Sequence, residues 1–114
     1  MKKILILSAN PKNTKNLRLD EEIREIKNTL QLSPHRDEFE IVTESAVQVD
    51  DLNRFLSHHQ PTIVHFSGHG TGTDGLALED NFGNQQLVST QALAKLFDLF
   101  QKQVECVLLT ACYS

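Results

Sequence analysis

The sequence predicts an α/β fold, with a mainly parallel sheet and helices on both of its faces. Segments 4–7, 63–66 and 104–110 are short and mostly apolar, which is typical of strands buried on both faces of a parallel sheet. Segments with apolar residues at helical spacing lie between them, and this alternation favours a three-layer sandwich. Right-handed crossovers then give the expected strand order 2-1-3-4.

The first half of the chain predicts strands at 4–7 and 38–43, the second of these near an edge of the sheet. The helix between them carries apolar residues at helical spacing and ends at Ser33-Pro34. Acidic residues at its start, including Asp20 and Glu22, suit the positive N-terminal end of a helix. A second, short helix follows, and we expect Asp50 to cap it.

The second half continues from a central strand at 63–66 into a tight turn expected at 67–70. A small β-hairpin is predicted around residues 81–84. Ser89 or Thr90 then caps a third helix, whose apolar residues recur at helical spacing. The fourth strand of the sheet is predicted at 104–110.

Length and charge limit the possible functions. At 114 residues we expect one domain, residues 1–114. The net charge is −4 with scattered Lys and Arg, so we expect no nucleic-acid partner. No apolar run approaches the roughly 18 residues of a membrane span, and the apolar start is too short for a signal peptide. We therefore expect no membrane partner and a cytoplasmic location.

Two motifs carry the chemistry that the sequence predicts. His69 follows the strand at 63–66 between two glycines, and Cys112 follows the strand at 104–110. If these strands are neighbours, both residues reach one cleft at the carboxyl ends of the sheet. A histidine can then assist a thiolate nucleophile, and the backbone N–H groups of Gly70 and Cys112 could stabilise an oxyanion. The alternative is a buried structural thiol and a loop histidine.

The remaining candidates have simpler interpretations. Cys106 lies among apolar residues, and we expect it to be an inert core thiol. It lies six residues from Cys112 on one strand, about 20 Å away, too far for a disulfide between them. His65 is expected to be a core histidine. Zinc-ligand spacing does not occur, and a hairpin rather than a helix follows the glycines. We therefore expect no metal and no cofactor.

The fourth strand poses a question of its own. It is strongly apolar, yet the chain stops two residues after Cys112. An uncovered apolar edge favours pairing with another chain. We therefore expect either that the fold is truncated after this strand or that a second chain covers it.

The paired motifs resemble those of a known family. His-Phe-Ser-Gly-His-Gly at 65–70 and Leu-Thr-Ala-Cys-Tyr-Ser at 109–114 are similar to the two motifs of CHAT domains. These are bacterial relatives of caspases, metacaspases and separase. Segments 10–24, 75–80 and 104–107 also resemble this family. The resemblance implies a caspase-like sandwich and a cysteine endopeptidase acting on protein or peptide substrates. It implies His69 and Cys112 as the dyad, and the Gly70 and Cys112 amides as the oxyanion hole.

The resemblance implies less about specificity. Metacaspases cleave after Lys or Arg, using acidic residues in the first helix region and just before the cysteine. Asp20 and Glu22 fall near the first place, but Thr110 stands at the second. The chain resembles the N-terminal, large-subunit half of the family fold. An inactive scaffold or oligomerising subunit is the alternative function. A receiver-like or flavodoxin-like module is disfavoured, because no acidic cluster follows the first strand.

Overall fold

The computed structural model describes residues 2–9, 19–45, 47–70 and 75–113. Within these ranges the strands are β1 (Lys2–Ser8), β2 (Phe39–Glu44), β3 (Ile63–Gly70), β4 (Leu76–Glu79), β5 (Gln85–Val88) and β6 (Cys106–Tyr113). The helices are α1 (Leu19–Gln31), α2 (Val49–His59) and α3 (Thr90–Leu99), with a short 3₁₀ turn η1 (Arg36–Glu38) before β2. None of the helices in these ranges is long and apolar enough to cross a membrane.

The long strands form a parallel sheet in the order β2-β1-β3-β6. This confirms the predicted order 2-1-3-4, with β6 as the fourth long strand. The predicted hairpin is β4 and β5, which pair with each other in antiparallel fashion. β4 also pairs antiparallel with the last residues of β3, so the hairpin extends the sheet beside the carboxyl end of its central strand.

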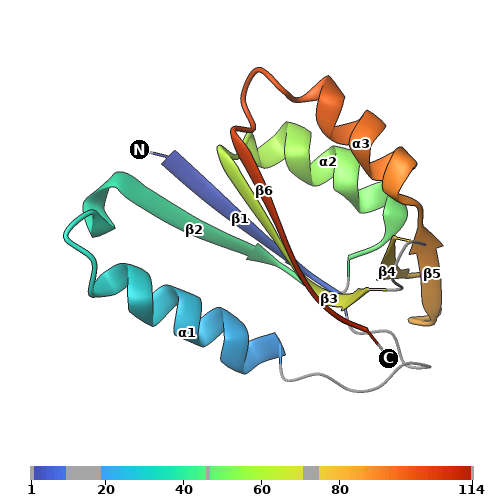
Figure 1. The fold of residues 1–114 in the computed structure, drawn as a ribbon, viewed down its shortest axis with the longest axis horizontal. Helices are drawn as coiled ribbons and strands as arrows, with labels where there is room; N and C mark the ends of the chain where they lie inside the picture. Colours follow the sequence, from blue (N-terminus) through green and yellow to red (C-terminus); the bar gives the residue numbers. More distant parts are fainter. Residues whose placement is uncertain (1, 10–18, 46, 71–74, 114) are drawn as a thin grey trace.

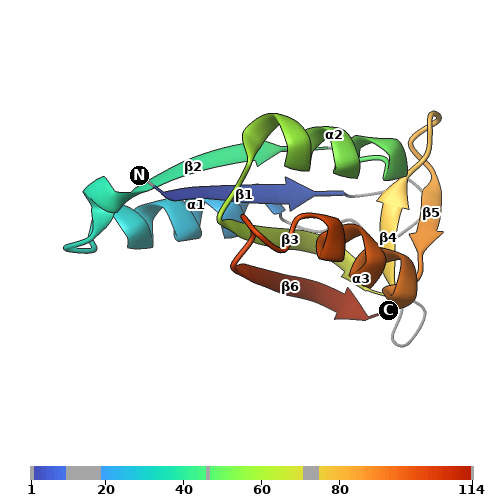
Figure 2. The same ribbon diagram turned by 90° about the horizontal axis from the view of Figure 1, so that it is seen from above.

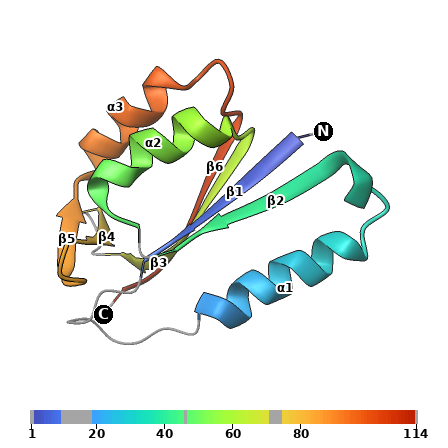
Figure 3. The same ribbon diagram turned by 180° about the vertical axis from the view of Figure 1, so that it is seen from behind.

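The helices cover both faces of the sheet, as predicted. In Figure 1, α2 and α3 lie side by side on one face, and α1 lies on the other. The view from above in Figure 2 shows the same separation. This arrangement is consistent with a caspase-like α/β sandwich. Figure 3 shows that the carboxyl end of β6 and the β4–β5 hairpin lie at the same end of the molecule.

The hydrophobic core lies between the sheet and the α2–α3 layer. Leu5 and Leu7 of β1, Val64 and Phe66 of β3, and Leu56 of α2 are almost completely buried and pack in one cluster. These strand residues are two positions apart, because alternate side chains of a strand share one face. The core therefore fixes which residues of β1 and β3 face α2 and which face α1.

Of three local predictions, the structure confirms one and contradicts two. Ser89 caps α3, since its Oγ accepts a hydrogen bond from the Ala92 N–H at 3.1 Å. The prediction that Asp50 caps α2 was wrong. The N-cap is Gln48, whose N–H donates to Asp51 Oδ2 at 3.0 Å. The tight turn expected at 67–70 was also wrong, because β3 continues through Gly70.

Candidate active site

The two sequence motifs meet at the carboxyl ends of β3 and β6. These strands are parallel neighbours, and His69 is paired in register with Cys112. Gly70, the next residue, is paired with Tyr113. Adjacent strands lie about 4.8 Å apart, so the backbones of the histidine and the cysteine are immediate neighbours. Their side chains lie outside the described part of the structure.

Pairing on both edges explains why β3 stays extended through its glycine-rich end. β1 pairs with β3 as far as Ser67. Beyond that point β4 takes over the same edge, pairing with His69 and Gly70. β6 runs along the whole of the other edge. The motif at 65–70 is thus the end of a central strand, held by neighbours on both sides.

Gly68 lets β3 pass close to the loop after β1. A Cβ atom at this position would lie 2.8 Å from the backbone oxygen of Ala9 and 3.1 Å from the Phe66 ring. The Ala9 N–H in turn donates to the Ser67 carbonyl at 3.4 Å. A side chain on residue 68 would push this backbone contact apart, one residue before His69.

A polar cluster lies on the α1 side of β3. The Ser67 hydroxyl, fully buried, donates to Glu22 Oε1 of α1 at 3.1 Å. His65 Nε2 lies 3.6 Å from the same carboxylate oxygen. The side chains of His65 and Glu22 are 15% and 31% exposed, so water still reaches the carboxylate. These contacts fasten the first part of α1 to the central strand.

The link between Ser67 and Glu22 was absent from our sequence-based expectations. The alternation of β3 offers a signal for it: Val64 and Phe66 enter the core, so His65 and Ser67 must face α1. The choice of Glu22 as their partner depends on how α1 crosses the sheet, which sequence spacing does not fix.

The proposed specificity residues are only partly brought together. Glu22 contacts Ser67, and Ser67 is paired in register with Thr110 of β6. Glu22 and Thr110 are therefore both neighbours of Ser67. Asp20 lies in the first turn of α1, and its side chain lies outside the described part, as does that of Thr110.

Two other expectations are answered by burial. The prediction that Cys106 is a core residue was wrong, because Cys106 is an exposed free thiol at the start of β6. Its local sequence is apolar, but no described element covers that face of β6 there. His65 is half-buried beside Glu22, in keeping with a core histidine. Among the described residues, no group of three His, Cys, Asp or Glu side chains is placed to hold a metal ion.

The sequence of the chain matches a known protein family. The CHAT domain family model matches residues 2–114. The chain belongs to the CHAT domain family. This confirms the resemblance seen in the two motifs, and it extends over β1 to β6.

Two curated relatives align with almost the whole chain. One, named "Probable protease", comes from Gillisia limnaea and is 28% identical over 116 residues, covering 100% of this chain and 20% of that protein. The other, named "Roc-COR-CHAT protease", comes from an unknown prokaryotic organism. It is 28% identical over 120 residues, covering 99% of this chain and 11% of that protein. The CHAT chain thus spans a fifth or less of these relatives.

Proposed function

We propose that this CHAT chain carries the catalytic dyad of a caspase-like cysteine endopeptidase, with His69 and Cys112 as its members. One observation carries the proposal: the two residues are paired in register on neighbouring parallel strands. The family membership and the protease names of both relatives support the same reaction class. The substrate is then a protein or peptide, and residues 1–114 form one domain that carries the dyad.

The proposed reaction has two halves. The Cys112 thiolate attacks the scissile carbonyl carbon, forming a C–S bond. The C–N bond then breaks, and His69 gives its proton to the leaving amine. Water then attacks the thioester carbon while the neutral His69 takes one of its protons. The C–S bond breaks, the acid is released, and the thiolate and protonated His69 are restored. No cofactor or metal is needed to balance either half.

Charge develops on the carbonyl oxygen in both halves and requires fixed donors. We assign this role to the backbone N–H groups of Gly70 and Cys112. Gly70 follows His69 at the end of β3, next to β6. Backbone donors held by a sheet need no reorganisation during the reaction, which is why such donors stabilise an oxyanion effectively.

Substitution of the dyad tests the assignment. Cys112→Ala and His69→Ala should each abolish cleavage of a peptide library while leaving the circular dichroism spectrum unchanged. Cys106→Ala is the matched control, since it removes the other cysteine and should leave cleavage intact. Cleavage that persists in Cys112→Ala at the wild-type rate would overturn the dyad.

For specificity, we assign the pocket that receives the residue before the scissile bond to Glu22, with Asp20 and Thr110 beside it. Glu22 supplies a carboxylate that is 31% exposed and held beside β3 by Ser67. Thr110 adjoins through its register with Ser67. A carboxylate at this place favours Lys or Arg in the substrate through a charge-assisted hydrogen bond.

A second candidate function, a scaffold that self-associates, is favoured by the exposed surface of β6. Val107 packs against the core, whereas Leu108 is 50% exposed and Cys106 is exposed. Within the described sheet β6 pairs with β3 alone. An uncovered strand edge with exposed apolar side chains is a surface on which another strand can pair.

A further inference from the structure

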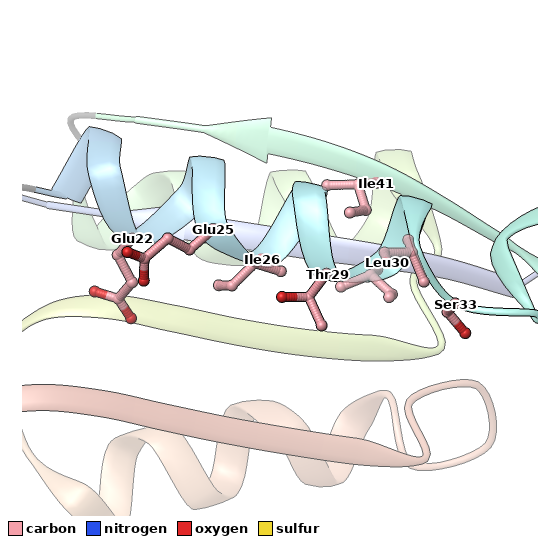
Figure 4. Close-up of a pocket in the computed structure, with 8 residues that line it drawn as sticks. Glu22, Glu25, Ile26, Thr29, Leu30, Ser33 and Ile41 are labelled. Atoms are coloured by element: carbon pink, nitrogen blue, oxygen red, sulfur yellow. The ribbon is translucent and has the colours of Figure 1, made fainter.

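A pocket of about 530 Å³ lies between α1 and the sheet, on the face opposite α2 and α3. Its walls are aliphatic side chains, namely Ile26 and Leu30 of α1, Ile4 of β1 and Ile41 of β2. Figure 4 shows these α1 residues along the underside of the helix. The volume falls within the range of about 300–1,000 Å³ that is usual for small-molecule sites.

One end of this pocket is acidic. Glu22 and Glu25 both line it, and they lie toward the start of α1 in Figure 4. Residues three apart share one face of a helix. No Lys, Arg or His side chain is among the described residues that line the pocket. A ligand that fills it therefore meets aliphatic walls along its length and negative charge at one end.

The two carboxylates differ in their protein contacts. Glu22 accepts a hydrogen bond from Ser67 and lies near His65. Glu25 is exposed, and no ion pair or side-chain hydrogen bond joins it to another residue of the described ranges. Glu25 can therefore contact a ligand cation without first giving up a partner among the described residues.

We propose that this pocket binds a small amphiphilic cation, an alkylammonium compound whose chain lies against the isoleucines and Leu30 and whose charge lies by Glu25 and Glu22. A polypeptide segment is a poorer occupant. Its backbone would bring several N–H and C=O groups. Besides the carboxylates, the polar side chains among the described lining residues are the hydroxyls of Thr29 and Ser33. A ligand with one cationic group and an apolar chain leaves no such groups unpaired.

Binding of this kind has two expected signatures. Each methylene buried against the aliphatic wall contributes about 0.8 kcal/mol, which is about a fourfold gain in affinity per carbon until the pocket is filled. The charge contributes less, because Glu25 is exposed. An exposed ion pair is worth about a two- to fivefold change in affinity.

The direct test is a titration of methyl-labelled protein with n-hexylammonium chloride, followed by NMR. The methyl resonances of Ile4, Ile26, Leu30 and Ile41 should shift and saturate. Hexanol should bind about two- to fivefold more weakly, and hexanoate more weakly again because of the carboxylates. The titration measures binding alone, so its result does not depend on peptidase activity.

Matched variants assign the charge. Glu25→Gln should bring the affinity for hexylammonium closer to that for hexanol, with Glu22 retaining part of the attraction. Glu40→Gln is the control, because Glu40 is exposed on β2 and its neighbour Ile41 lines the pocket, so the two side chains lie on opposite faces of the strand. Equal binding of hexylammonium and hexanoate, shifts confined to other methyl groups, or equal losses in the two variants would each overturn the proposal.

Discussion

Ser67 of β3 and Glu22 of α1 are joined by a hydrogen bond of 3.1 Å, in which the buried hydroxyl donates to the carboxylate. The bond spans 45 residues of sequence and fastens the start of α1 to the central strand, two residues before His69. The placement of α1 over the sheet thus depends partly on one buried serine.

Ser67→Ala should lower the free energy of unfolding by about 1 kcal/mol, because it removes a buried donor from a carboxylate that water reaches only in part. Chemical denaturation measures this change. Ser57→Ala is the matched control, since Ser57 is exposed on α2 and should alter stability by no more than about 0.5 kcal/mol. Equal stability of the two variants would show that the hydrogen bond contributes nothing.

Gly75→Ala should destabilise the β4–β5 hairpin. Gly75 has a φ of +108°, and a Cβ atom there would lie 1.9 Å from the backbone oxygen of Val88. Gly83→Ala is the comparison, because Gly83 also has a positive φ, of 80°, and we expect a cost of about 1–2 kcal/mol there. Thermal unfolding should show a clearly larger loss for Gly75→Ala. A loss no larger than that of Gly83→Ala would contradict the close approach of Gly75 to the Val88 backbone.

Much of this fold could be predicted because local patterns decide it. The apolar spacing and Ser89 suffice to place α3, since a cap and one apolar face are local properties. The strand order follows from strand–helix alternation and crossover handedness. Of the failed predictions, the one for Asp50 as the cap of α2 is local. Those for Cys106 and for residues 67–70 concern contacts between distant segments. Cys106 is exposed because nothing described covers that face of β6, and residues 67–70 stay extended because β4 and β6 pair with them.

The candidate site also has features that the sequence predicts and features that it does not. The meeting of His69 and Cys112 at one end of the sheet was predicted from two strand-end motifs. Their pairing in register was not predicted, because the register depends on which residues of β6 align with which residues of β3. The contact between Ser67 and Glu22 depends on the crossing of α1 over the sheet. A carboxylate on a helix face has no sequence signal that names its partner 45 residues away.

Glu22→Gln should reduce cleavage of substrates with Lys or Arg before the scissile bond by about ten- to a hundredfold, the value of a charge-assisted hydrogen bond. Substrates with a neutral residue there should be cleaved at an unchanged rate. Glu40→Gln is the control, because Glu40 is exposed on β2 with its side chain on the face opposite that of Ile41, and it should preserve the preference. The measurement is kcat/KM for paired peptides that differ only at this position. An unchanged ratio in Glu22→Gln would remove Glu22 from the specificity pocket.

Leu108→Lys should reduce any self-association of the chain, because it places a charge on the exposed surface of β6. Light scattering after size exclusion, over a range of protein concentrations, gives the mass. Leu32→Lys is the control, since Leu32 is 87% exposed and lies beyond α1, away from β6. A wild-type protein that stays monomeric at the highest concentration would contradict the scaffold function.

The most direct test of the dyad is the alkylation rate of each cysteine as a function of pH, with mass spectrometry to separate the two sites. Cys106 serves as an internal reference, because it is an exposed free thiol on the same strand. We predict that Cys112 reacts faster than Cys106 near pH 7 and slows in His69→Ala, while Cys106 is unaffected. Cys112 reacting like an ordinary thiol with a pKa of about 8.5, in wild type and His69→Ala alike, would contradict the account.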